Sequence, residues 1–170
     1  MLSSATRSWP APDHDVAIVG AGFGGIGAAI ELKRKRVDDF VIFDKWHGVG
    51  GTWLANTYPG VAVDIPAFIY SFSYEQRSNW SRLFALGGEI RQYAEDVVDK
   101  HDLRPKLRLN TTLTRCVFDE HDELWRIYDD AGKATTARFV VSAIGGLERP
   151  KLPDIDGIGD FGGTLMHTAL

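Results

Sequence analysis

The chain has 170 residues, of which 44% are hydrophobic and 25% charged, and its formal net charge at pH 7 is −4. This composition is typical of a globular domain that buries its own core, and the negative charge argues against nucleic acid as the main partner. No apolar run approaches the ~20 residues of a membrane span, so we expect no membrane partner either. We recognise no secretory signal in the first residues and expect none, and Cys116 is the only cysteine. We therefore predict a cytoplasmic location and interpret Cys116 as a small buried apolar residue.

Residues 1–14 are polar and contain proline, which predicts a flexible lead-in. The next run, Val16–Val19, is apolar and rich in β-branched residues, which predicts a strand buried on both faces. Gly20, Gly22 and Gly25 follow it with G-x-G-x-x-G spacing. In this motif the first glycine allows a tight turn and the second lets a pyrophosphate approach the backbone. The third lets the following helix pack closely against the strand.

That helix should run from about Gly24 to Arg36 and would present free N–H groups and its positive dipole end to the phosphates. Residues Phe40–Phe43 predict a second buried strand, and Asp44 at its end can hydrogen-bond a ribose hydroxyl. Strand, glycine loop, helix and acid in this order predict a dinucleotide site. The alternative is an ordinary glycine-rich turn with an incidental aspartate, and the motif alone does not distinguish FAD from NAD(P).

Residues Lys45–Ile65 show no clear periodicity and are rich in Gly, Pro, Asn and aromatic residues. Connections longer than about 12–15 residues are usually functional or disordered. Trp46, Trp53 and Tyr58 argue against disorder, because disordered segments are poor in aromatics. We therefore predict an ordered loop that faces a ligand.

The second half of the chain predicts one helix and three strands. Residues Glu89–His101 place apolar side chains on one helical face. Strands are expected from Leu107 towards Phe118, over Leu124–Tyr128, and over Arg138–Ile144, the last of which should return to a central parallel sheet. A loop should follow over residues 147–163. The whole pattern predicts an α/β fold, namely a three-layer Rossmann-like domain with a parallel central sheet and a small antiparallel β-meander.

Several short motifs occur together between Asp15 and Leu170. They are Gly20–Gly25, Gly50–Trp53, Asn56–Gly60, Asp64 with Tyr70–Ser73, Asn79–Ser81, Ala143–Gly145, Arg149–Pro153 and Phe161–Thr168. With these motifs, the chain resembles the N-terminal part of a Baeyer–Villiger monooxygenase, in the wider class of flavin-containing monooxygenases. The most specific motif is Phe161–Thr168, which is similar to the family's F-x-G-x-x-x-H fingerprint and places its histidine at His167.

The resemblance implies an FAD-binding Rossmann-type domain over residues 15–160, present as its first half, and the start of a linker over residues 161–170. It implies an FAD-dependent, NADPH-using monooxygenase that inserts one oxygen of O2 next to the carbonyl of a ketone or related small molecule. NADPH would bind through a domain that is not present in this chain. The chain would then be inactive alone, and the missing C-terminal portion of the enzyme would be its partner.

The resemblance also assigns one group of residues to the adenosine diphosphate half of FAD. The glycine motif would lie along the pyrophosphate, and Asp44 would hold the ribose. The backbone of Val117 would meet the adenine, as an extended strand edge can. The group consists of Gly20, Gly22, Phe23, Gly25, Asp44, Lys45 and Val117.

A second group would face the flavin. Asp64 would sit beside the flavin ring and is the catalytic candidate, and Tyr70 would lie near the FAD chain. Where the chain leaves the sheet, Ala143 and Gly145 would pack against the cofactor. The remaining members of the group are Gly51, Thr52 and Trp53.

Each of these assignments has an alternative. Trp53 and Tyr70 are also suitable core aromatics, and Asp64 is also suitable as a solvated or capping acid. The chain as a whole is also compatible with a non-catalytic FAD- or nucleotide-binding module, or with a flavin hydride-transfer reductase, although such reductases typically need a reactive cysteine pair. No histidine shares a ligand spacing with a cysteine, so we predict no metal site.

Overall fold

The computed structural model describes residues 10–147 and 149–167. Its centre is a six-stranded sheet with the strand order β3-β2-β1-β6-β5-β4. The strands are β1 (His14–Val19), β2 (Phe40–Phe43), β3 (Leu107–Arg108), β4 (Leu113–Asp119), β5 (Leu124–Asp129) and β6 (Ala134–Ser142). β1 pairs in parallel with β2 and β6, and β2 pairs in parallel with β3, whereas β4, β5 and β6 form an antiparallel meander. The predicted parallel sheet with an added meander is therefore confirmed.

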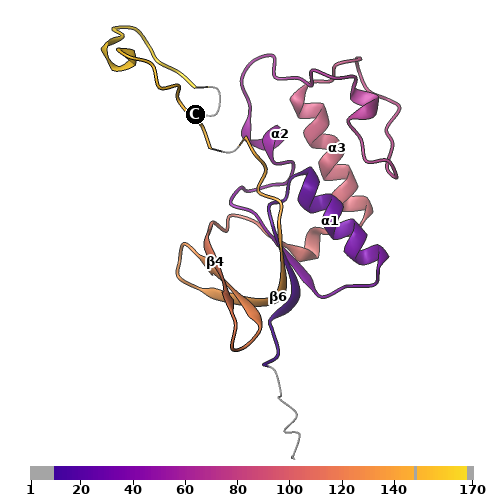
Figure 1. Cartoon of the computed structure of the whole chain (residues 1–170). Coiled ribbons are helices and arrows are strands. Elements are labelled where there is room, and N and C mark those ends of the chain that lie inside the picture. The colour runs from indigo at the N-terminus through magenta and orange to yellow at the C-terminus, as the bar shows by residue number, and fades with distance from the viewer. Residues whose placement is uncertain (1–9, 148, 168–170) are drawn as a thin grey trace, which may run out of the picture.

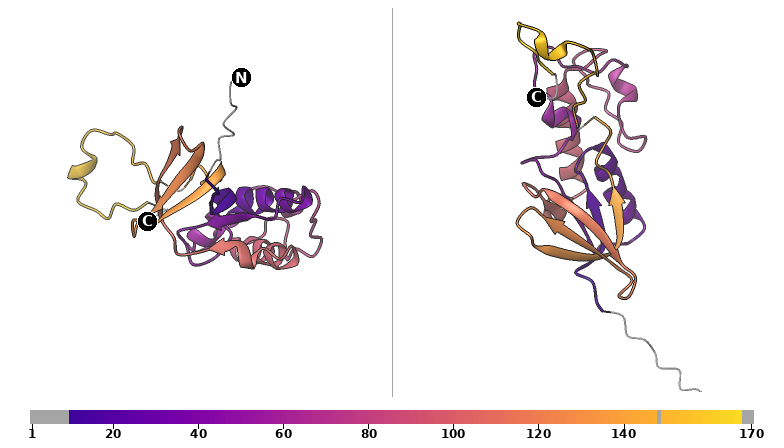
Figure 2. Two further views of the ribbon diagram at one scale, coloured as in Figure 1. Left: turned by 90° about the horizontal axis from the view of Figure 1, so that it is seen from below. Right: turned by 60° about the vertical axis from the view of Figure 1, so that its left-hand side comes forward.

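The helices before residue 107 cover one side of the parallel strands, the meander lies on the other, and the 3-10 helix η3 (Ile158–Asp160) lies in the C-terminal segment away from the sheet (Figures 1 and 2). The helices before residue 107 are α1 (Phe23–Arg34), α2 (Thr52–Ala55) and α3 (Gly87–Lys100), with the 3-10 helices η1 (Ala67–Ile69) and η2 (Arg104–Lys106). The two long helices are the predicted ones, shifted by one or two residues at their ends. The short α2 was not predicted, and it begins within the segment that we expected to be a ligand-facing loop.

Successive residues of β1 and β2 enter two different cores, because side chains alternate between the faces of a strand. On the helical face, Ile18 and Ile42 pack with Ile26, Ile30 and other residues of α1 and α3. On the opposite face, residues from the meander cover the sheet, and the buried members of this core are Ala17, Val41, Phe43, Ile127 and Ala137. Helices, sheet and meander thus form the three layers expected from the sequence.

The strand expected from Leu107 towards Phe118 is in fact two strands in different parts of the sheet. β3 pairs in parallel with β2, whereas β4 starts at Leu113 and, among the strands that the structure describes, pairs only with β5. Between them Asn110 has a φ of 53°, a left-handed conformation that breaks an extended chain. The N–H of Thr111 donates to the carbonyl of Asp44 (2.9 Å), which holds this break next to the end of β2.

The predicted lead-in ends earlier than residue 14, because His14 is the first residue of β1. Just before it, Asp13 is tied to β6: its N–H donates to Thr136 Oγ1 (3.0 Å) and its carboxylate accepts the Thr136 N–H (2.8 Å). Residues 1–9 lie outside the described part, as does Thr168 at the end of the fingerprint motif. In the part that is described, residues 149–167 form a loop apart from η3, and no helix is long and apolar enough to cross a membrane.

The alternating cores predict a large difference between two isoleucine truncations. Ile42 is fully buried in β2, whereas Ile144, just after β6, is 63% exposed. Ile42→Ala should lower the free energy of unfolding by about 3 kcal/mol, because it removes buried methyl groups and leaves a cavity. Ile144→Ala should change it by less than ~0.5 kcal/mol. Urea unfolding followed by circular dichroism measures both, and equal effects of the two substitutions would contradict the assignment of the core.

Candidate functional site: two glycine loops at the end of the sheet

The first glycine loop is packed so tightly that two of its positions admit no side chain. A Cβ at Gly20, whose φ is 108°, would lie 2.4 Å from the carbonyl oxygen of Ala143. A Cβ at Gly25 would lie 1.8 Å from the carbonyl oxygen of Gly20. Ala143 directly follows β6 and donates its N–H to the carbonyl of Val19 (2.8 Å). The structure therefore brings Gly20, Gly25 and Ala143 together where β1 and β6 end.

A second glycine loop lies directly against the first. The N–H of Gly50 donates to the carbonyl of Ala21 (3.0 Å), and Gly51, with a φ of 56°, is the residue before α2. A Cβ added to Gly22 would lie 3.4 Å from the Gly51 Cα, and one added to Gly51 would lie 3.0 Å from the Gly22 Cα. Two backbones therefore meet without side chains between them. We call this junction the glycine cradle, formed by residues 20–25 and 50–51.

The helix that begins at the cradle has free N–H groups at its start. Gly22 precedes α1 with extended backbone angles (φ −78°, ψ −172°). Within the described residues, no side chain caps α1, and its first turn contains no acidic residue. The first N–H groups of a helix have no carbonyl partner within the helix, and the positive end of the helix dipole lies there as well. The start of α1 is therefore suited to bind an anion such as a diphosphate.

Asp44 connects the cradle to the end of β2. Its Oδ2 accepts the N–H of Ala21 (2.6 Å), and its Oδ1 accepts the N–H of Trp46 (2.9 Å). An ionised carboxylate can accept about four hydrogen bonds. Counting the described residues, two of these positions remain for a ligand hydroxyl. Asp44 is thus both a support of the glycine loop and a candidate ribose acceptor.

Three aromatic side chains lie together at the cradle, and we call them the aromatic wall: Phe23, Trp53 and Tyr70. Trp53 donates its Nε1–H to the hydroxyl of Tyr70 (3.0 Å), and the two rings meet edge to face. Phe23, the first residue of α1, lies with its ring centroid 5.3 Å from that of Tyr70. Trp53 and Tyr70 are half-buried and pack against the cluster of Val63, Ala67, Ala85 and Ile90. Their packing supports the core-aromatic alternative, while their contact with Phe23 places them beside the first glycine loop.

Other candidates are at the surface and make no hydrogen bond to the cradle within the described residues. Asp64 and Thr52 are exposed, as is Lys45, which lies near the Trp46 ring. Val117 lies on β4, at the edge of the meander. Gly145 is exposed with a φ of 72°. The cofactor contacts assigned to these residues remain predictions.

Two features of the meander bear on the predictions from sequence: the exposure of Cys116 and a group of potential metal ligands. Cys116 is exposed on β4, so its interpretation as a buried apolar residue was wrong. Nearby, Asp119, His121 and Asp122 bring potential metal ligands within 4.8 Å of one another. Arg126 already contacts both carboxylates, at 3.1 Å to Asp119 and 2.5 Å to Asp122. We therefore interpret this group as an ion-pair cluster at the turn between β4 and β5.

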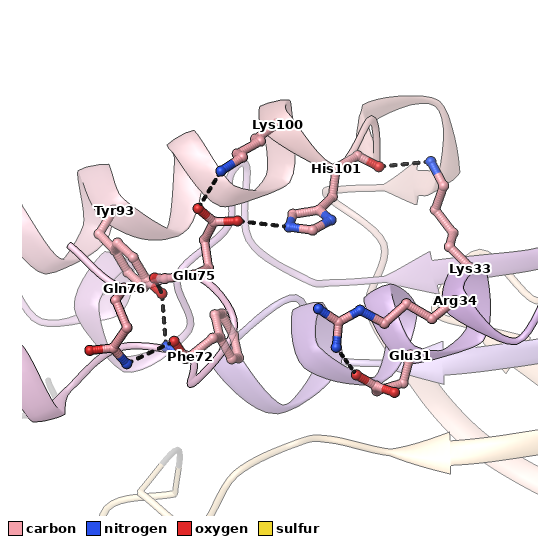
Figure 3. Close-up of polar contacts among 9 residues, drawn as sticks. All are labelled: Glu31, Lys33, Arg34, Phe72, Glu75, Gln76, Tyr93, Lys100 and His101. Atoms are coloured by element: carbon pink, nitrogen blue, oxygen red, sulfur yellow. Dashed lines mark hydrogen bonds and ion pairs between the residues drawn. The ribbon is translucent and has the colours of Figure 1, made fainter.

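Residues that the sequence patterns do not single out attach the loop after Tyr70 to α3 (Figure 3). Tyr93 accepts the N–H of Phe72 (2.8 Å) and donates its hydroxyl to the carbonyl of Glu75 (2.7 Å). Burial raises the pKa of the Tyr93 phenol, which keeps it protonated and able to donate. A tyrosine on the apolar face of the predicted helix was the available signal, since a buried hydroxyl needs a partner.

The side chain of Glu75 makes a second attachment at the end of α3. Its carboxylate accepts the Lys100 ammonium (2.6 Å) and contacts His101 Nε2 (3.1 Å), as Figure 3 shows. Both hydrogen bonds lower the pKa of Glu75, and the bond from Lys100 has the larger effect. Lys33 of α1 donates to the carbonyl of His101 (2.7 Å), so that the ends of both long helices meet here.

Replacing Glu75 by glutamine should make stability less sensitive to acid. Because the folded pKa of Glu75 lies below the unfolded value of about 4.3, the ion pairs stabilise the protein above that pH. This contribution is lost as the pH falls through the folded pKa. The difference in Tm between wild type and Glu75→Gln should therefore shrink from about pH 6 to about pH 3. Exposed Glu120→Gln is the control, and a difference that stays constant with pH would contradict the assignment.

Comparison with known proteins agrees with this geometry. The family model described as an NAD(P)-binding Rossmann-like domain matches residues 18–86. The chain is 44% identical over 169 residues to a Baeyer–Villiger monooxygenase of Pseudomonas aeruginosa, covering 98% of this chain and 32% of that protein. The chain thus spans about a third of the length of this curated relative.

Solved structures show the same likeness. Cyclohexanone monooxygenase from Rhodococcus sp. Phi1 bound to NADP+ superposes with a TM-score of 0.81 at 38% identity, over 94% of this chain and 31% of that one. OTEMO in complex with FAD and NADP gives a TM-score of 0.81 at 32% identity, again over 94% of this chain and 31% of that one. In sequence and in its Rossmann-like fold, the chain is therefore similar, over nearly its whole length, to about a third of each of these monooxygenases.

Proposed function

We propose that this chain binds FAD, with the diphosphate in the glycine cradle, and serves as the FAD-binding part of a Baeyer–Villiger monooxygenase. The observation that carries the proposal is the contact between the two glycine loops at the start of α1. There, Gly22 and Gly51 leave backbone without side chains next to uncapped helix N–H groups. The FAD and NADP bound in the related OTEMO structure support the same cofactor class.

The residues of the cradle fit the adenosine diphosphate half of FAD. The first-turn N–H groups of α1 would donate to the phosphate oxygens, and the absence of Cβ atoms at Gly22 and Gly51 would allow close approach. Asp44 keeps its two hydrogen bonds to Ala21 and Trp46 and would use its remaining lone pairs for a ribose hydroxyl. Ala143, packed against Gly20, would close the cradle on the side of β6.

At the other end of the site, the aromatic wall would border the flavin. FAD bound there would supply the redox chemistry of a reaction in which NADPH is the reductant and one oxygen of O2 is inserted next to a ketone carbonyl. The hydrogen bond between Trp53 and Tyr70 fixes the orientation of both rings. Asp64, the catalytic candidate from the sequence, would lie beside the flavin ring, and its carboxylate is exposed.

NADPH and ketone binding are proposed for the whole monooxygenase and not for these residues alone. FAD would already occupy the glycine cradle of this chain, so NADPH would bind elsewhere. The matched relatives devote about two thirds of their length to sequence outside the matched region. We therefore expect these 170 residues to bind FAD without ketone-dependent oxidation of NADPH. A flavin disulfide reductase is less suitable, because Cys116 is the only cysteine of the chain.

The proposal predicts that a single methyl group at Gly22 weakens FAD binding without unfolding the protein. A Cβ at Gly22 would meet only backbone atoms of Gly51, the Cα at 3.4 Å and the N at 3.8 Å, which are ordinary contact distances, but it would lie within the cradle. Gly22→Ala should therefore raise the Kd for FAD by at least about tenfold. Its urea midpoint should stay near that of the wild type.

Titration of the purified chain with FAD, followed by flavin fluorescence and the visible spectrum, measures this effect. The matched control is Gly159→Ala, because nothing lies within 4 Å of a Cβ at Gly159. That variant should bind FAD as the wild type does. If the wild type binds no FAD, or if Gly22→Ala binds it equally well, the diphosphate does not lie in the glycine cradle.

A further inference from the structure

Tyr93 is a buried residue with a polar hydroxyl, and its ring packs on Phe23 of the aromatic wall. It lies on α3, only 2% exposed, within the same apolar cluster as Ile18 and Ile42. A phenol buried in apolar surroundings is costly unless it is hydrogen-bonded. Its hydroxyl makes one bond as acceptor and one as donor, and both go to backbone groups of the same short segment.

That segment is the turn Phe72–Glu75. Glu75 donates its N–H to the carbonyl of Phe72 (2.9 Å), which closes the turn. Because Tyr93 bonds to the two remaining groups of these same residues, it fixes the turn against α3 at both ends. No helix or regular strand covers residues 70–76. The Tyr93 hydroxyl therefore replaces the hydrogen bonds that regular secondary structure would provide.

The Phe72–Glu75 turn also supports the aromatic residues of the candidate site. The Phe72 ring stacks on Phe23 with centroids 5.4 Å apart, and the Tyr93 ring stacks on Phe23 at 5.9 Å. Tyr70, two residues before Phe72, contacts Phe23 and accepts the hydrogen bond of Trp53. A shift of the turn would therefore move Tyr70 and Trp53, which we place at the flavin end of the site.

We propose that Tyr93 is a positioning residue for the flavin end of the FAD site, because its hydroxyl fixes the Phe72–Glu75 turn and thereby orients Tyr70 and Trp53. This inference rests on the proposed FAD binding. It assigns Tyr93 no contact with the cofactor. The adenosine diphosphate half should be unaffected: Phe23 touches the turn through its ring, but the backbone contacts between the two glycine loops and the described hydrogen bonds of Asp44 involve no residue of the turn.

The structure offers a conservative variant and a matched control in the same cluster. Tyr93→Phe removes the hydroxyl and keeps the ring that packs on Phe23 and Trp80. The turn remains attached through Glu75, whose side chain still contacts Lys100 and His101. The control is Tyr74→Phe: the Tyr74 ring stacks on Phe72, and its hydroxyl makes no hydrogen bond within the described residues.

The experiment titrates wild type, Tyr93→Phe and Tyr74→Phe with FAD and, separately, with ADP. Tyr93→Phe should raise the Kd for FAD about tenfold, leave the Kd for ADP within about twofold, and change the absorption spectrum of bound flavin. Tyr74→Phe should match the wild type with both ligands.

Two outcomes overturn the inference while FAD binding stands. One is that Tyr93→Phe binds FAD as the wild type does, with the same spectrum. The other is that it loses ADP and FAD affinity equally, which would show a general loss of structure instead of a local shift. Failure of the wild type to bind FAD or ADP would instead reject the proposed function, and this inference with it.

Discussion

The candidate site depends on the two hydrogen bonds that the carboxylate of Asp44 accepts. By accepting the N–H groups of Ala21 and Trp46, this carboxylate joins the end of β2 to the glycine loop after β1 and to the segment leading to the second glycine loop. These two loops are otherwise separated by α1 and β2 along the chain. The same side chain therefore aligns the start of α1 with Gly50–Gly51 and leaves lone pairs for a ligand.

The glycines of the first loop differ in what requires them. Gly20 and Gly25 are required by the packing of the protein itself, since a Cβ at either position would overlap a carbonyl oxygen. Gly22 is different: its backbone angles suit any residue, and a Cβ would fit within the protein. A glycine that folding does not require, at the junction of the two glycine loops, is the feature that points to a ligand.

Local spacing predicted the first part of this site, and long-range packing determined the rest. The order of Val16–Val19, the glycine motif and Asp44 predicted the βαβ unit because each step depends on neighbours in sequence. The contact of Gly22 with Gly51 and the bonds of Tyr93 to residues 72 and 75 join distant segments, and periodicity carries no information about them. The split between β3 and β4 was missed because it depends on the backbone conformation of Asn110.

The most direct test of the account is a two-dimensional 1H–15N NMR titration of the chain with ADP, which lacks the flavin. If the diphosphate lies in the glycine cradle, the largest shifts should occur at the amides of Ala21, Gly22, Phe23 and Gly24, together with Trp46 beside Asp44. Saturable shifts confined to the β4–β5 meander, with the amides of the glycine loop unchanged, would contradict the central claim.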